Sequence, residues 1–200
     1  YELKNIDSFC IDSRLVKKND IFMPIKGNYI DPHNFISDVL KNKPAMIFSE
    51  QVYDNKNIIK VDSTKKVLNE ISKKWIKHFK QTVIAITGSN GKTTTKEILT
   101  SIFSYIYKSN NTKGNYNSSI GLPVNLFNFS LDAEINIIEM GASKPNEIDQ
   151  LCQIVKPHYS VITNIHNAHI ANFNTFEELV KTKLSIFKNT INQGLIFENN

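Results

Sequence analysis

An apolar run that passes through a glycine-bounded turn into an amphipathic run constrains this chain most. Residues 83–86 are apolar, residues 87–91 form the turn, and residues 92–106 carry apolar side chains at helical spacing. A phosphate-binding loop needs this order of strand, turn and helix, because backbone N–H groups and the positive end of the helix dipole then point at one spot. Lys92 adds an ammonium group, and the hydroxyl of Thr93 can hold Mg²⁺.

The motif is a shortened variant of the usual phosphate-loop spelling. The usual form has a glycine five positions before Gly91, where this chain has Ile86. An ordinary turn before a helix is the alternative, but glycine, lysine and threonine in this order after a buried strand argue against it. We therefore predict ATP binding by Gly88, Ser89, Asn90, Gly91, Lys92, Thr93 and Thr94.

Composition sets wide limits. The 200 residues are 40% hydrophobic, which suits one large domain or two small ones. The sequence has no run of 18 apolar residues and no signal pattern, and its two cysteines show no metal-binding spacing, which predicts a reducing, cytoplasmic location. The net charge is +5, and nucleic-acid binding is one reading of it, but the lysines come as scattered pairs that more often coat solvated faces. An anionic substrate such as a nucleotide also fits. The chain starts at Tyr1, and we expect it to be a piece of a longer protein.

Residues 1–80 read as a small α/β domain. Strands are predicted at 21–25, 45–48 and 58–61, with a helix at 33–40. A second helix begins after Ser63, with apolar residues every four positions up to Phe79. The likeliest boundary therefore falls at residues 79–82, which divides the chain into domains 1–80 and 81–200.

Two polar clusters in the first domain have two readings. Residues 12–14 contain Ser13 and Arg14, and residues 26–33 contain Asp31 and His33. Such side chains can hydrogen-bond a base or a phosphate, and arginine can do so with two bonds at once. Surface turns with a helix cap are built from the same residues, and the residues alone favour that reading.

The second domain reads as alternating strands and helices, which predicts a right-handed parallel α/β sheet over residues 83–200. Asn115 and Asn117 lie in a polar loop that suits a charged ligand, although turns use the same residues. Glu139 ends an apolar strand at 135–140, where it could bind Mg²⁺ or form a salt bridge.

Two further side chains extend this candidate site. His169 follows the strand at 159–164, at the sheet edge that carries the glycine turn, so it could bind metal or phosphate. Thr175 and Glu178 form a capping box at the start of a helix that carries Lys183 at the spacing of its apolar residues. An inward lysine is rare unless it is paired or modified, and a surface lysine is the alternative.

Together these motifs resemble the ATP-dependent Mur ligases of peptidoglycan synthesis. Within that family the chain is most similar to the branch that adds D-alanyl-D-alanine to UDP-N-acetylmuramoyl-tripeptide (UDP-MurNAc-tripeptide). The resemblance spans nearly the whole chain and lies in residues 12–14, 26–35, 43–45, 87–94, 114–117, 120–123, 139–143, 147–148, 162–165 and 168–169.

The resemblance implies a UDP-binding domain, a central ATPase domain and a third domain, of which this chain covers the first and the front of the second. It implies that the ATP γ-phosphate passes to the tripeptide carboxylate, and that the amine of D-alanyl-D-alanine then attacks this acyl phosphate. The implied catalytic residues are Lys92, His169 and Lys183. Lys92 and the loop amides would hold phosphates, Thr93 and Glu139 one Mg²⁺, and His169 a second, while Lys183 would be carbamylated; Ser13, Arg14, Asp31 and His33 would contact or frame the uridine diphosphate.

The chain departs from the family pattern at Pro32, Ser118, residues 174–175 and Ser185. The change at Ser185 weakens the role of Lys183 most, because it removes a neighbouring carboxylate. Three alternatives stay open: another Mur ligase, a folate-polyglutamate-like ligase, or a module that only binds ATP and a UDP-sugar.

Overall fold

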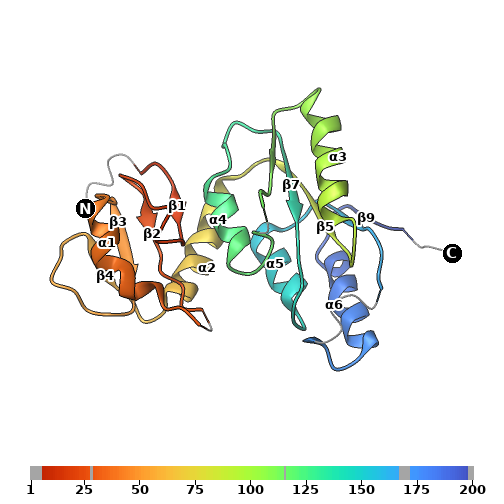
Figure 1. Cartoon of the computed structure of the whole chain (residues 1–200). Coiled ribbons are helices and arrows are strands. Elements are labelled where there is room, and N and C mark those ends of the chain that lie inside the picture. Colours follow the sequence, from red (N-terminus) through yellow and green to blue (C-terminus); the bar gives the residue numbers. More distant parts are fainter. Residues whose placement is uncertain (1–5, 28, 115, 167–171, 198–200) are drawn as a thin grey trace. The chain divides into compact units, whose positions relative to one another are not determined.

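The structure is a computed structural model that describes residues 6–27, 29–114, 116–166 and 172–197 (Figure 1). The chain divides into two compact units, Tyr1–Ser72 and Lys73–Asn200. This division falls inside helix α2 (Thr64–Trp75), before the boundary at 79–82 that the sequence predicts. Among the described helices, none combines the length and the apolar composition needed to cross a membrane.

The first unit contains a small parallel sheet. Its strands lie in the order β1 (Phe9–Cys10), β2 (Ile21–Phe22), β3 (Met46–Ser49) and β4 (Ile58–Lys60). A short turn of helix, η1 (Pro32–Phe35), leads into α1 (Ile36–Lys41). Strand β2 is shorter than the predicted 21–25, as expected where Pro24 follows, because proline cannot donate to a ladder.

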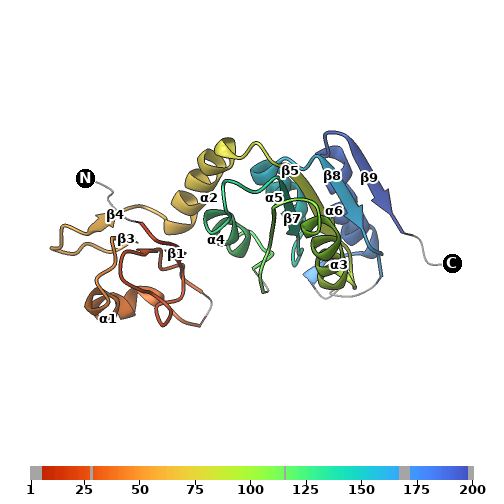
Figure 2. The same ribbon diagram turned by 90° about the horizontal axis from the view of Figure 1, so that it is seen from above.

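The second unit contains a five-stranded sheet in which every pair is parallel, as the sequence predicts (Figure 2). The order is β6 (Ser109–Asn111), β7 (Ile135–Glu139), β5 (Thr82–Thr87), β8 (Tyr159–Ile162) and β9 (Gln193–Ile196). The helices are η2 (Ile76–His78), α3 (Lys92–Ser104), α4 (Gly121–Phe127), α5 (Glu147–Val155) and α6 (Phe176–Lys188). The sequence predictions did not include β6 or α4.

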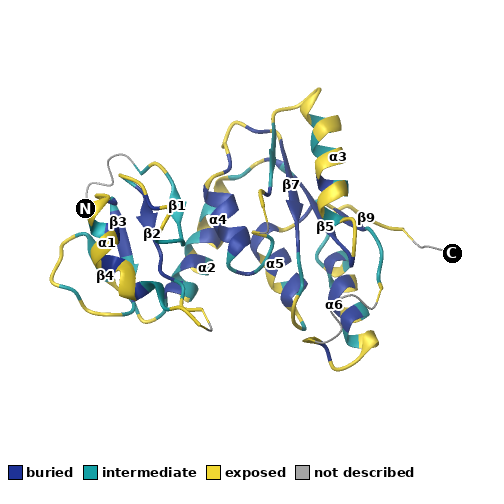
Figure 3. Ribbon diagram, in the orientation of Figure 1, coloured by how far each residue is buried: buried dark blue, intermediate teal, exposed yellow. Residues whose placement is uncertain are grey.

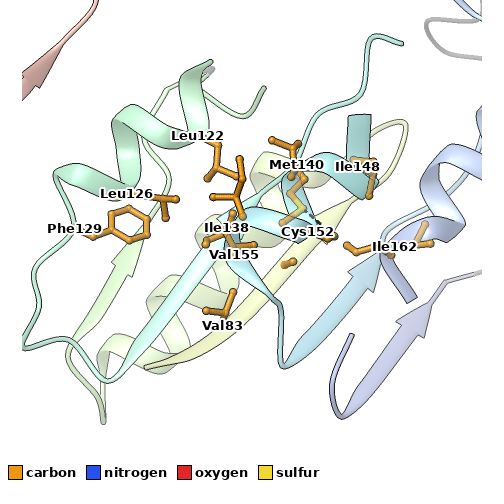
Figure 4. Packing of buried hydrophobic residues seen from close by; sticks show 14 residues of the cluster. Val83, Leu122, Leu126, Phe129, Ile138, Met140, Ile148, Cys152, Val155 and Ile162 are labelled. Carbon is orange, nitrogen blue, oxygen red and sulfur yellow. Dashed lines mark hydrogen bonds between the residues drawn. The ribbon is translucent and has the colours of Figure 1, made fainter. Parts of the chain in front are cut away.

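Side chains alternate across the central strand β5. Val83 and Ala85 join the main core, which also takes residues from α4, α5 and α6 (Figure 4). Ile84 and Ile86 point to the other face, where Leu99 and Phe103 of α3 pack on them. The isoleucines Ile98 and Ile102 of α3, and Ile106 past its end, are exposed. Figure 3 shows much of α3 in the colour of exposed residues.

Strand pairing places three strand ends together. In the sheet, Ile86 of β5 pairs with Glu139 of β7, and Thr87 of β5 pairs with Ile162 of β8. Because all three strands are parallel, their carboxyl ends lie at one edge, which is where ligands bind in such sheets. The glycine turn, Glu139 and the segment after Ile162 therefore meet there.

The core of the second unit predicts a measurable stability difference. Leu126→Ala removes a fully buried side chain and should lower the free energy of unfolding by about 2–5 kcal/mol, because a cavity is left behind. Leu131→Ala is the matched control, since Leu131 is 51% exposed, and it should change stability by less than about 0.5 kcal/mol. Urea unfolding followed by the fluorescence of Trp75, which packs on Phe127 in this unit, reports both values. Equal losses in the two variants would contradict the packing described here.

Candidate phosphate-binding site

Two glycines give the turn between β5 and α3 its shape. Gly91 caps α3 with a left-handed φ of 75°, a conformation that L side chains rarely adopt. Gly88 has φ 149°, and a methyl group there would clash with the hydroxyl of Thr163, just after β8. The backbone at Gly88 therefore approaches the neighbouring strand end more closely than any side chain would allow.

The segment after β8 fastens this turn to the sheet. The N–H of Ser89 donates to the carbonyl of Asn164 at 3.0 Å, and the N–H of Asn90 donates to Oδ1 of Asn164 at 3.0 Å. Thr163 Oγ1 donates to the carbonyl of Asn90 at 2.6 Å. The sequence predicted that successive N–H groups of the turn point at one anion, but two of them face Asn164. The N–H groups of the first turn of α3 have no acceptor within the helix, so an anion could bind at the start of α3.

Two lysine ammonium groups converge on one carbonyl. Lys92 Nζ donates to the carbonyls of Gly88 and Ser89, at 2.9 and 3.0 Å, and Lys183 Nζ donates to that of Gly88 at 3.0 Å. Lys183 is 3% exposed, so it faces inward. Burial, and to a lesser extent the charge of Lys92, lowers the pKa of Lys183 from 10.5 to about 8. Burial also lowers the pKa of Lys92, which nearby Glu139 partly opposes. Two ammonium groups that lie close together and are shielded from water attract an anion.

Glu139 is held at each of its oxygens. Thr93 Oγ1 donates to Oε2 at 2.9 Å, and Asn117 Nδ2 donates to Oε1 at 2.8 Å. The backbone N–H of Glu139 donates to Thr112 Oγ1 at 2.9 Å, and the residue is only 3% exposed. The carboxylate is therefore fixed between the first turn of α3 and the loop that follows β6.

Lys92, Lys183 and Asn117 line a pocket of about 200 Å³. Its walls come from the glycine turn, the loop after β6, the loop after β7 and α6: Gly88, Lys92, Asn117, Ser118, Gly141, Ala142, Ser143, Glu147 and Lys183. Buried Glu147 ties two of these walls together, since it accepts from the N–H groups of Ser119 and Ser143 at 3.4 and 2.9 Å. The sequence analysis includes Glu147, Thr163 and Asn164 in the motifs of the family resemblance, but it gives neither them nor Thr112 a role in a site.

The oxygen groups around Glu139 fit a divalent cation of the magnesium type. A carboxylate and a threonine hydroxyl are hard ligands, and Mg²⁺ is usually bound by one or two carboxylates with water and phosphate oxygens. Within the described residues, no three His, Cys, Asp or Glu side chains are arranged around a common point. Thr93 and Glu139 are the described residues of this site that could hold such an ion.

The remaining predicted residues lie elsewhere. His169 and Asn115 fall outside the described residues. Thr94 is exposed in the first turn of α3.

Arg14, in the first unit, is exposed, and its Nε and Nη2 donate to the two carboxylate oxygens of Asp12. These hydrogen bonds lower the pKa of Asp12. Ser13 lies half-buried in the same turn. Asp31 caps η1 and accepts from His33, whose ring is 2% exposed and whose Nε2 accepts from the N–H of Glu50. Both ring nitrogens of His33 are thus hydrogen-bonded within the fold, where the ring supports residues 26–33 and is not exposed to a ligand.

Comparisons with known proteins agree with this geometry. The family described as the Mur ligase middle domain matches residues 86–200. Proteins named UDP-N-acetylmuramoyl-tripeptide–D-alanyl-D-alanine ligase are 32% identical in Bacillus subtilis and 37% identical in Rickettsia prowazekii. These alignments cover 98% and 92% of this chain, but only 44% and 42% of those proteins.

Solved structures give the same result. MurF from Acinetobacter baumannii superimposes with a TM-score of 0.89 at 31% identity, covering 96% of this chain and 43% of that one. MurF from Thermotoga maritima, solved in complex with ADP, gives 0.87 at 33% identity, covering 96% and 46%. This chain thus spans less than half the length of these relatives. The match of the family over residues 86–200, on a fold with the same arrangement, shows that the chain belongs to the Mur ligase family.

Proposed function

We propose that this chain holds Mg²⁺-ATP at the start of α3 and forms part of a ligase that adds D-alanyl-D-alanine to UDP-MurNAc-tripeptide. One observation carries the nucleotide part: Thr93 and Asn117 both donate to Glu139, beside two lysines that meet at Gly88. The ligand named in the Thermotoga maritima structure, ADP, supports it. The names of the relatives support the substrates.

The residues of this pocket suit phosphoryl transfer. Such a reaction depends on positioning and on neutralising charge more than on covalent help from the protein. The α3 N-terminus and Lys92 bind and orient the phosphates, and Glu139 and Thr93 hold the cation. When bound, Mg²⁺ neutralises phosphate charge. The terminal phosphoryl group then passes to the tripeptide carboxylate, and the amine of the dipeptide displaces phosphate from that carbon.

The roles of the other predicted residues follow from the same proposal. Ser13, Arg14, Asp31 and His33 belong to the part that recognises the uridine diphosphate, with His33 acting by framing its loop. His169 and Asn115 stay candidates for metal and substrate binding. A cytoplasmic location and the absence of nucleic-acid binding also stay predictions.

Removing the charge of Glu139 should weaken nucleotide binding only when a divalent cation is present. Glu139→Gln keeps the size and an acceptor for Thr93 but removes the carboxylate. Loss of a direct ligand should cost at least the roughly 10–100-fold in metal affinity that outer partners cost. Titration with a fluorescent ATP analogue, with and without Mg²⁺, measures the effect.

Glu134→Gln is the matched control, since Glu134 is exposed just before the same strand. It should bind as the wild type does. If Glu139→Gln bound Mg²⁺-ATP as tightly as the wild type, Glu139 would not be a metal ligand.

The substrate proposal predicts which amine drives phosphate release. The full-length protein, given ATP, Mg²⁺ and UDP-MurNAc-tripeptide, should release phosphate continuously only when D-alanyl-D-alanine is added. L-glutamate and a folate with glutamate are the competing substrates to test, and turnover with either would contradict the proposal. The 200-residue chain is a second control. It should bind nucleotide without turnover, because it spans less than half of its relatives.

The buried Lys183 predicts a pH-dependent stability difference. Its pKa is about 8 in the folded protein against 10.5 normally, so between these values the unfolded chain binds a proton that the folded chain has lost. Stability from this group therefore rises as pH rises through that window. Lys183→Met should abolish a rise of about 2–3 kcal/mol between pH 7 and 10. Urea unfolding of both proteins at the two pH values tests this, and a constant difference between them would contradict it.

The lowered pKa also bears on the predicted modification. Carbamylation requires the neutral amine, and a lysine with a pKa of about 8 supplies far more of it at neutral pH than an ordinary lysine. We propose that Lys183 is carbamylated in the active protein. Ser185, where the family commonly has glutamate, donates its hydroxyl to the carbonyl of Thr182 and supplies no carboxylate to this site.

A further inference from the structure

Lys96 is a buried cation that the proposed reaction does not use. It lies in α3, is 2% exposed, and is among the largest fully buried side chains of the described residues. Its ammonium donates to the carbonyl of Thr112 at 2.7 Å and pairs with Glu97 at 2.8 Å. Glu97 is 60% exposed, so its charge is largely screened by solvent. Burying an ammonium group costs free energy unless its contacts compensate. The contact with the carbonyl of Thr112 is therefore the main compensation for burying Lys96.

Thr112 leads from Lys96 directly to Glu139. It follows β6, and its N–H donates to the carbonyl of Ile137 at 3.1 Å. Its hydroxyl accepts the backbone N–H of Glu139 at 2.9 Å. Thr112 is 1% exposed, so both of its bonds to β7 are shielded from water. A force on Thr112 therefore moves the end of β7, where the carboxylate of Glu139 stands.

Lys96 and Thr93 lie on the same face of α3, because they are three residues apart in a helix. Thr93 contacts the carboxylate of Glu139, and Lys96 contacts its backbone through Thr112. One helix face thus holds Glu139 at both its side chain and its main chain. The distance from the Thr93 hydroxyl to the carboxylate depends on both contacts.

We propose that Lys96 is a positioning residue for the divalent cation, acting through Thr112 to fix Glu139 against Thr93. The inference rests on the proposed function, since it assumes that Glu139 and Thr93 hold the ion. The side chain of Lys96 is long enough to donate to the carbonyl of Thr112. An apolar side chain of similar length could fill the same space, but it could not bind that carbonyl.

Lys96→Met should weaken cation binding without weakening nucleotide binding as such. Partners of metal ligands typically contribute about 10–100-fold to metal affinity, so we expect about a tenfold loss. The measurements are the affinity of the protein–ATP complex for Mn²⁺, read by electron paramagnetic resonance, and the affinity for ADP in EDTA. The first should fall and the second should stay within about twofold of the wild type.

Two matched variants separate this role from a general one. Glu97→Gln removes the exposed partner on the same helix and should leave Mn²⁺ affinity unchanged. Thr112→Val removes the hydroxyl that accepts from Glu139 and should lower Mn²⁺ affinity as Lys96→Met does. If Lys96 acts through Thr112, the variant that carries both Lys96→Met and Thr112→Val should bind Mn²⁺ about as well as whichever single variant binds it less tightly. The two changes would then break the same chain of contacts, so their effects would not add.

Fold integrity is checked by Trp75 fluorescence. If Lys96→Met does not fold, Lys96→Gln replaces it, because it keeps an amide donor one atom shorter, and its Mn²⁺ affinity should fall less than tenfold but measurably. Unchanged Mn²⁺ affinity in the folded variant, or equal losses of Mn²⁺ and ADP affinity, would overturn the inference. A wild-type protein that binds no Mn²⁺ with ATP would instead overturn the proposed function.

Discussion

The pairing of β5 between β7 and β8 is the constraint on which the site depends. Each strand contributes one part at its carboxyl end: the glycine turn from β5, Glu139 from β7, and Thr163 with Asn164 after β8. The parallel register places all three strand ends at one edge, and a shift of β7 by one residue against β5 would turn Glu139 to the opposite face of the sheet. The apolar cores on both faces of the sheet fix that register, so the geometry of the site depends on the packing of the sheet.

The site holds two lysine ammonium groups and one nearby carboxylate, and burial of these groups strengthens the effect of the excess positive charge. Lys92 and Lys183 share the carbonyl of Gly88, and the nearby carboxylate, Glu139, is already engaged by two neutral donors. Burial lowers the pKa of both lysines, which means that each ammonium loses hydration that the protein does not fully replace. A phosphate chain would supply that missing interaction at Lys92, so the burial that destabilises this ammonium group favours binding of an anion.

Much of the second unit could be predicted from sequence. Its strand–turn–helix order, its parallel sheet and the inward direction of Lys183 follow from local spacing. Strand β6 could not be predicted so easily. Its residues, Ser109–Asn111, are polar, and the strand forms because it pairs with the buried strand β7. Tertiary pairing decides such cases, since propensity alone disfavours asparagine in strands.

The contacts that fasten the site were missed for a related reason. Asn164 is 74 positions from Asn90, and nothing in either local sequence says that an amide will occupy the N–H groups of a phosphate loop. His33 shows the opposite error. Its polar neighbours in the sequence suggest ligand binding, but its ring makes hydrogen bonds within the fold.

The shortened glycine motif is explained by the same long-range contacts. A full-length phosphate loop wraps its anion with its own successive N–H groups. Here the turn is shorter, and the N–H groups of Ser89 and Asn90 are held by Asn164. The turn therefore needs the end of β8 to keep its shape, which requires that Gly88 lack a side chain where it meets Thr163. The proposed anion site therefore relies on Lys92 and on the first turn of α3, while the sheet holds the turn in place.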